Sequence, residues 1–206
     1  MMADDQEPLT RSTGQVHLPS LVALALALIG TCGSILLSVG RGLKACPLCI
    51  YQRSFAMSVF AVLLIGVLAD RARPALSSLF SLPLAVAGLG VAAFHEYLVW
   101  SGVLECPQGL LGMGTAPAQS LALFALLTAA LAAGAFSRPR EGLRPLATVG
   151  AVGLGLVLAW SSIISSPPLP PPPTKPYDPV TQPLDMCRPP FQGPAADSAE
   201  ASPSDA

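Results

Sequence analysis

The chain has 206 residues, of which 52% are hydrophobic and only 11% are charged, and its formal net charge is −1. A soluble domain carries about 25% charged residues, so this composition argues against a soluble globular protein. The near-neutral charge and the lack of a basic tract exclude nucleic-acid binding as a working hypothesis.

Five stretches are long and apolar enough to cross a bilayer, which takes about 20 helical residues. The expected spans cover residues 18–40, 54–69, 76–100, 118–136 and 146–165. Because lipid offers no hydrogen-bond partners to unpaired backbone N–H and C=O groups, each span is expected to be an α-helix. The predicted fold class is therefore an all-α membrane protein. We expect a helical bundle over residues 18–165, preceded by a polar N-terminal segment over residues 1–17.

The first span is expected to remain in the membrane rather than to be a cleaved signal peptide. The segment before it carries Asp4, Asp5 and Glu7 against Arg11, and the apolar run exceeds a usual signal-peptide core. Cys32, within this span, is expected to be a small apolar packing residue.

A C-x-x-C pair, Cys46 and Cys49, lies where the first span ends and the second begins. Such a pair can cycle between dithiol and disulfide, and a thiol near a helix N-terminus and a guanidinium is driven toward the reactive thiolate. Arg53 follows Cys49 by one helical turn, so both side chains share a face. The pair is therefore a candidate for electron transfer at a membrane surface.

Less specific explanations exist for the same residues. The cysteine pair is alternatively a static disulfide or half of a zinc site, although zinc needs about four ligands and the sequence has no second C-x-x-C. Arg53 is alternatively an arginine that snorkels to the membrane interface. Its planar donor group also suits the carbonyl oxygen of a quinone, and both roles are compatible.

The third span contains His95 and Glu96 near its end. Ionisable groups within a span usually face a cavity or the bundle interior. His95 is therefore a candidate proton donor or hydrogen-bond partner for a quinone, and the alternative is an interfacial residue close to water. Cys106 follows just past this span, before a glycine-rich segment that is expected to form a compact turn on the membrane.

A proline-rich tail over residues 166–206 follows the fifth span. From Pro167 to Pro190 nearly every second residue is proline, which predicts a polyproline II segment, with disorder after Gln192. At about 3.1 Å per residue this segment is long enough to bring Cys187 back across the membrane face. The tail is otherwise expected to be a spacer.

With five spans, the first loop, the third loop and the tail share one side of the membrane. The cysteines that face this side are Cys46, Cys49, Cys106 and Cys187. A lone exposed thiol is a liability in an oxidising compartment, so we favour a Cys106–Cys187 disulfide over two unpaired thiols.

The orientation follows from the basic turns. The turn between the second and third spans carries Arg71 and Arg73. The turn between the fourth and fifth spans carries Arg138, Arg140 and Arg144. Both turns are expected on the cytoplasmic side, which places the cysteines outside. The basic residues beside the C-x-x-C pair favour the opposite orientation, but we attribute their presence to the chemistry of the pair.

The run from Cys46 to Arg53, CPLCIYQR, resembles the signature of the DsbB family, the disulfide bond formation protein B family. Looser resemblance extends over residues 18–136. Members of that family are membrane thiol oxidoreductases that reoxidise a periplasmic thioredoxin-fold partner and reduce a quinone. The resemblance implies an enzyme in the bacterial inner membrane that uses ubiquinone or menaquinone and supports disulfide bond formation through a soluble DsbA-like oxidase.

The same resemblance implies roles for single residues. Cys46 and Cys49 match the quinone-coupled pair, and Arg53 matches the quinone-site arginine. His95 lies near a position where the family can place a quinone-contacting histidine. Cys106 matches the first cysteine of the partner-facing pair. Cys187 is the candidate for the second, and we expect these two cysteines to be catalytic with the first pair.

This chain departs from the family pattern in one respect. The family usually has four spans and both partner-facing cysteines in the loop between spans three and four, whereas here that loop contains Cys106 and the second candidate, Cys187, follows an added fifth span. The alternative functions are a vitamin K epoxide reductase-like enzyme, a membrane metal carrier that uses the C-x-x-C pair, and a passive scaffold with a stapled tail.

Overall fold

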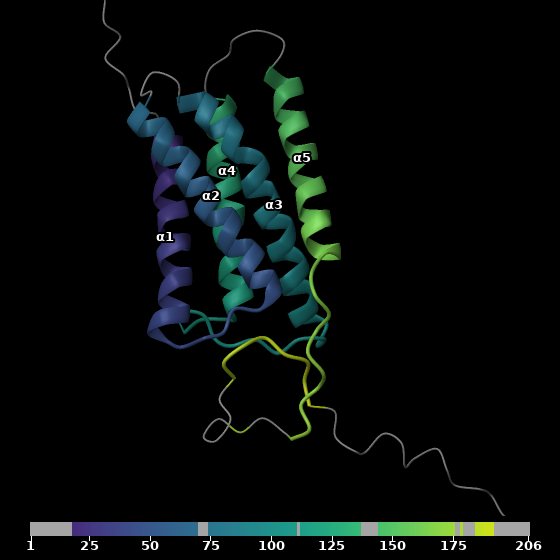
Figure 1. The fold of residues 1–206 in the computed structure, drawn as a ribbon. Helices are drawn as coiled ribbons and strands as arrows, with labels where there is room; N and C mark the ends of the chain where they lie inside the picture. The colour runs from purple at the N-terminus through teal and green to yellow at the C-terminus, as the bar shows by residue number, and fades with distance from the viewer. Residues whose placement is uncertain are drawn as a thin grey trace, which may run out of the picture.

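The computed structural model describes residues 18–69, 74–110, 112–136, 144–175, 178 and 184–191. The predictions for the N-terminal segment, for the arginines at positions 71, 73, 138 and 140, and for the chain after residue 191 lie outside these residues. The described part contains five long helices, drawn in Figure 1. They are α1 (Leu18–Gly40), α2 (Pro47–Ala69), α3 (Pro74–Trp100), α4 (Ala116–Phe136) and α5 (Arg144–Ile164).

The predicted fold class is confirmed. All five helices are long and apolar enough to cross a membrane, and the only β-structure recorded among the described residues consists of isolated bridges in loops. In Figure 1 the helices run side by side, up and down, as a bundle. The chain is a multi-pass membrane protein.

α2 starts at Pro47, earlier than the expected start at residue 54, because the C-x-x-C motif supplies its N-terminus. The Sγ of Cys46 accepts a hydrogen bond from the backbone N–H of Cys49 at 3.2 Å, the bond that a serine makes at an N-cap. Pro47 takes the first helical position, where a missing N–H costs nothing. The hydropathy of residues 54–69 marks the apolar part of this helix but not its polar first turns.

α3 lies at the centre of the bundle. It packs against α2, α4 and α5, whereas α1 packs against α2 and α4. Many of the buried contacts are made by small residues, which let the helices approach closely where lipid provides no hydrophobic driving force. The central cluster includes Ala23, Ala27, Ala56, Val59, Leu63, Leu82, Ala85, Phe124, Leu127 and Leu131.

α5 packs mainly on α3, through small residues on both helices. A Cβ added at Gly155 would lie 2.6 Å from Cβ of Val86 and 2.7 Å from the carbonyl oxygen of Pro83. A Cβ added at Gly90 would lie 2.7 Å from Cβ of Ala159. The fifth helix is therefore fitted to α3 at close range.

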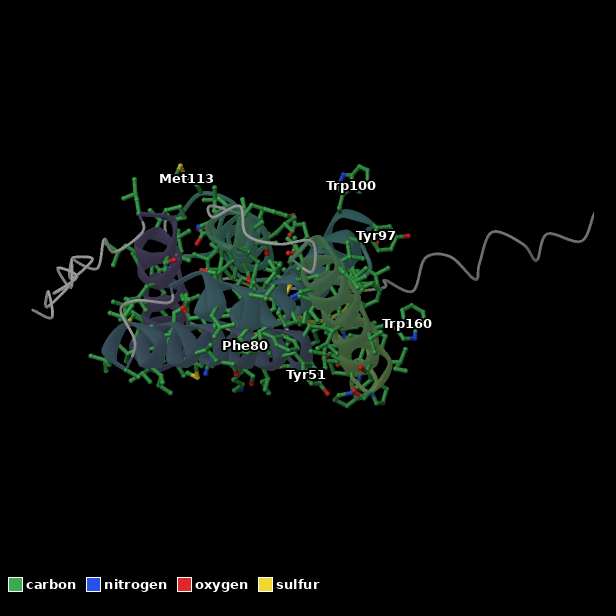
Figure 2. All side chains as sticks on the ribbon, turned by 90° about the horizontal axis from the view of Figure 1, so that it is seen from above. Tyr51, Phe80, Tyr97, Trp100, Met113 and Trp160 are labelled. Carbon is green, nitrogen blue, oxygen red and sulfur yellow. A yellow bond between two sulfur atoms is a disulfide. The ribbon has the colours of Figure 1, made fainter. Side chains whose placement is uncertain are left out.

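Aromatic side chains mark one end of the bundle. Tyr97 and Trp100 lie in the last turn of α3, and Trp160 lies near the end of α5. All three are largely exposed, and Figure 2 shows them pointing away from the helices. Tyr and Trp are typical of the membrane interface, so this end of the bundle is expected at the headgroup level.

The fit of α5 on α3 can be tested with a leucine at Gly155. Gly155→Leu should lower the stability of the purified protein by about 1–3 kcal/mol, because the added side chain overpacks the contact with Val86 and Pro83. Gly153→Leu is the matched control, because nothing lies within 4 Å of a Cβ at that position. Thermal unfolding in detergent measures both, and equal midpoints for the two variants would contradict the close α3–α5 contact.

Candidate functional site

Three segments that are far apart in the sequence meet at one end of the bundle. They are the α1–α2 loop, the α3–α4 loop and the tail after α5, all at the lower end in Figure 1. The backbone N–H of Lys44 donates to the carbonyl of Asp185 at 2.7 Å, and Glu105 and Arg188 exchange two backbone hydrogen bonds at 2.8 and 3.0 Å. The tail is therefore held against both loops.

An ion pair joins the tail to the first loop. Nζ of Lys44 lies 2.8 Å from Oδ2 of Asp185. The hydrogen bond to Asp185 raises the pKa of the Lys44 ammonium group, and the hydrogen bond from Lys44 lowers the pKa of the Asp185 carboxyl group. Both groups are exposed, so the pair contributes little to stability and mainly sets the position of the tail.

The first cysteine pair lies at the N-terminus of α2. The sulfur atoms of Cys46 and Cys49 are 2.6 Å apart, Cys46 is buried, and Cys49 is half-buried. The hydrogen bond to Cys49 and burial raise the pKa of the Cys46 thiol. Cys49 lies in the first turn of α2, where the helix dipole favours a thiolate.

The second cysteine pair is a disulfide. Cys106 in the α3–α4 loop is bonded to Cys187 in the tail, the pairing favoured from the sequence. Both residues are mostly buried, at 9% and 5% exposed. The neighbouring Glu105–Arg188 bridge brings the two backbones together at this point.

His95 lies between the two pairs. Its side chain is fully buried in α3. The Nε2 atom is 3.8 Å from Sγ of Cys46 and 3.5 Å from Sγ of Cys106, so it reaches one sulfur of each pair. The two pairs and the imidazole therefore form one cluster.

A short polar network holds His95 from the other side. Ser120 in α4 donates to Oε1 of Gln52 at 2.7 Å, and Nε2 of Gln52 lies 3.2 Å from Nδ1 of His95. The network crosses from α4 through α2 to α3. Polar groups buried in this way need such partners, because an unpaired group costs more than a hydrogen bond contributes.

A cavity of about 300 Å³ lies beside the first cysteine pair. Residues of α1, α2 and α4, the two loops and the tail form its mostly apolar walls, and Cys49, Gln52, Arg53 and Cys187 lie among the lining residues. His95 is not one of them, and its contact with a quinone, implied by the family resemblance, stays a prediction. The cavity therefore opens to the cysteines and to Arg53 but not to the imidazole.

Arg53 is fixed to α1 at the wall of this cavity. Its Nε donates to Oγ of Ser34 at 2.6 Å, and its Nη2 donates to the carbonyl of Ser34 at 2.9 Å and to Oγ of Ser38. Ser34 and Ser38 are one turn apart, so they present both hydroxyls on one face of α1. The guanidinium is pre-positioned rather than free at the membrane interface.

Sequence reasoning missed several of these residues. Gln52 and Ser120 orient His95, and Ser34 and Ser38 hold Arg53. The signal for the serines was present, since two hydroxyls one turn apart in an apolar span indicate a shared polar partner. Glu96 is next to His95 in the sequence and was considered with it. Its carboxylate accepts a hydrogen bond from Thr115 at 3.4 Å and is not part of the network around the cysteines.

The cluster also resembles a soft-metal site. The donor atoms of Cys46, Cys49, His95 and Cys187 lie within 4.8 Å of one another, a set of three sulfurs and one nitrogen that zinc accepts. Only the tertiary structure brings these four groups together, so the argument from sequence spacing against zinc was incomplete. The Cys187 sulfur is engaged in a disulfide, however, and a cysteine binds a metal only as a thiolate. In this state the donor set therefore lacks the third thiolate that such a zinc site needs.

Comparison with known proteins agrees with this geometry. The family model described as "Disulfide bond formation protein DsbB" matches residues 17–122, which contain α1, α2, α3 and the start of α4. No curated protein and no solved structure gives a significant match. The matched residues include the first cysteine pair, Arg53, His95 and Cys106, whereas α5 and Cys187 lie beyond them. Because this family model matches more than half of the sequence, the chain belongs to the DsbB family.

Proposed function

We propose that this protein is a thiol:quinone oxidoreductase that reoxidises a soluble thioredoxin-fold disulfide oxidase and passes the electrons to ubiquinone or menaquinone. One observation carries the proposal. A helix-capping cysteine pair and a cross-loop disulfide share one buried cluster beside a cavity that contains a fixed arginine. Neither a metal carrier nor a passive scaffold needs both pairs and the cavity.

The partner's two thiols enter at the second pair. A thiolate of the partner attacks Sγ of Cys106, the Cys106–Cys187 bond breaks, and Cys187 leaves as a thiolate. That thiolate attacks Sγ of Cys46 in the oxidised first pair, a Cys46–Cys187 bond forms, and Cys49 leaves as a thiolate. Support for this step comes from the sulfur atoms of Cys46, Cys49 and Cys187, which lie within 4.8 Å of one another.

The cycle closes with two further exchanges. The partner's second thiol displaces Cys106, so the partner leaves as a disulfide. Cys106 then attacks Cys187 in the Cys46–Cys187 bond, which restores the second pair and releases Cys46 as a thiolate. Two electrons have moved from the partner to the first pair, and the number of disulfide bonds is unchanged.

The residues around the cavity fit a quinone. The walls are mostly apolar, and the cavity volume is at the lower end of the range for small-molecule sites. Arg53 and Gln52 supply hydrogen-bond donors that suit carbonyl oxygens, and Cys49 supplies a sulfur at the N-terminus of α2. A bound quinone would supply a two-electron, two-proton acceptor.

We also propose a bacterial inner-membrane location with the cysteine end in the periplasm. α5 begins at Arg144, at the end of the bundle opposite the cysteines, and the sequences that join α2 to α3 and α4 to α5 are rich in arginine. Cytoplasmic loops carry such an excess. An oxidising compartment also suits a loop–tail disulfide.

The exchange between the pairs predicts a trapped cross-link. In the double variant Cys49→Ser, Cys106→Ser, mild oxidation should join Cys46 to Cys187, because the partner of each has been removed and their sulfurs are close. Peptide mapping under non-reducing conditions measures the product. The triple variant that also carries Cys46→Ser is the control and should lack it. Failure of the double variant to form this bond would contradict the relay.

The role of Cys49 predicts a complete loss of turnover. Cys49→Ser should abolish oxidation of a dithiol substrate by purified protein with a soluble quinone, because the serine hydroxyl cannot form the first-pair disulfide. Cys32→Ser is the matched control, since Cys32 lies in α1, exposed and outside the cysteine cluster. Quinone absorbance follows the reaction. Full activity in Cys49→Ser would refute the redox assignment.

The role of Arg53 predicts an effect on quinone binding. Arg53→Ala should raise the apparent KM for quinone roughly tenfold to a hundredfold, as expected for the loss of a hydrogen bond from a charged donor. Ser34→Ala separates positioning from direct contact and should cause a smaller rise, because Arg53 keeps its charge and its bond to the Ser34 carbonyl. Steady-state kinetics with varied quinone measures both. An unchanged KM in Arg53→Ala would remove Arg53 from the site.

A further inference from the structure

We propose that His95 is the shared hydrogen-bond donor of the two cysteine pairs. Its Nε2–H stabilises the Cys106 or Cys46 sulfur when either one is released as a thiolate, and Gln52 holds the imidazole in the tautomer that this requires. The inference rests on the proposed function, because it assigns a role within the exchange between the pairs. It gives His95 a role at the sulfurs rather than at the quinone.

The position of Nε2 is the first support. This atom lies 3.5 Å from Sγ of Cys106 and 3.8 Å from Sγ of Cys46, within hydrogen-bond range for sulfur. These two sulfurs come from different pairs and from different loops. In the proposed cycle they are also the two that leave as thiolates in the closing steps, when the partner is released and when the second pair re-forms.

The tautomer follows from the neighbouring network. The Ser120 hydroxyl donates to Oε1 of Gln52, so the amide group of Gln52 directs its Nε2 toward Nδ1 of His95. An amide NH₂ group only donates, so Nδ1 accepts and the ring proton of a neutral imidazole lies on Nε2. The hydrogen atom is therefore on the side of the ring that faces the sulfurs.

A fixed donor at this place favours the released sulfur over the bonded one. A thiolate is a charged acceptor and binds an N–H group more strongly than a disulfide sulfur does. Because the site is buried and the ring is already oriented, little reorganisation is needed when the charge develops. His95 neither gains nor loses a proton in this role, so the electron balance of each exchange is unaffected.

The surroundings argue for the sulfurs rather than the quinone as the target. Gln52 and Cys49 line the cavity, and His95 lies behind them. Both ring nitrogens already have neighbours, since Nδ1 faces Gln52 and Nε2 faces the two sulfurs. A direct bond from His95 to a ligand in the cavity would require the loss of one of these contacts.

The test measures exchange between the pairs without quinone. Full-length oxidised protein in quinone-free detergent is mixed with dithiothreitol, quenched with acid and alkylated, and the Cys46–Cys187 peptide is followed with time. His95→Leu should slow the decay of this species roughly tenfold to a hundredfold, the effect of removing one hydrogen bond to a charged group, because Cys106 and Cys46 are the sulfurs released as it decays. His95→Gln should restore much of the rate, because its amide N–H can reach the same sulfurs.

Two further variants test whether the orientation of the His95 ring matters. Gln52→Leu should slow exchange like His95→Leu, because Nδ1 loses its donor and the ring proton is free to leave Nε2. The pH profile of Cys46 alkylation in reduced protein should shift upward in both variants and return in His95→Gln, a change that a purely structural role would not produce. Glu96→Gln is the matched control on the same helix, since Glu96 contacts Thr115 rather than sulfur, and it should leave both measurements unchanged.

The outcomes separate this inference from the proposed function. An unchanged exchange rate in His95→Leu and Gln52→Leu would overturn it, and a raised KM for quinone in His95→Leu would then return His95 to the quinone site. Absence of the Cys106–Cys187 peptide in His95→Leu would mean that this variant does not fold. The exchange rates of Gln52→Leu and His95→Gln then test the inference in its place. A wild-type protein that exchanges sulfur but does not reduce quinone would contradict the proposed function and leave the role of His95 intact.

Discussion

The disulfide between Cys106 and Cys187 determines how the functional end of this protein is arranged. It closes a loop that contains all of α4 and α5, so the tail must return across the end of the bundle to the α3–α4 loop. The same path brings Asp185 to Lys44 beside the first cysteine pair. One covalent bond and a few polar contacts thus bring the α1–α2 loop, the α3–α4 loop and the tail together around His95.

The fifth helix is what makes this arrangement geometrically feasible. The family match ends within α4, and the family resemblance implies that both partner-facing cysteines come before that helix. An added span returns the chain to the cysteine side, because each span reverses the direction of the chain. The close contact of Gly155 and Ala159 with α3 then fixes where the tail begins. In the proposed relay, α5 and the tail supply the second partner-facing cysteine, which the family resemblance places in a loop.

Two sets of polar groups near the cysteines have different surroundings. Ser34, Ser38 and Arg53 lie at the wall of an apolar cavity, where a fixed positive donor suits a carbonyl oxygen. Ser120, Gln52 and His95 end at the sulfurs of both pairs. Because isolated polar groups are costly in a membrane interior, each set is held by partners on neighbouring helices. This separation divides the proposed chemistry into a quinone side and a sulfur side, with Cys49 and Gln52 between them.

The sequence by itself determined the membrane class, the five spans and the likeness to the DsbB family, because these depend on local hydropathy and on one short motif. The number of spans also placed four cysteines on one side of the membrane, since five spans put the first loop, the third loop and the tail on the same side. Local patterns did not determine the start of α2, because a cysteine cap and polar first turns lack the apolar signal. Only the tertiary structure decided that His95 lies between the sulfurs and not on the cavity, and that Gln52, Ser120, Ser34 and Ser38 hold the key side chains. Those contacts depend on how the helices rotate about their axes and how close small residues let them approach, which no single span encodes.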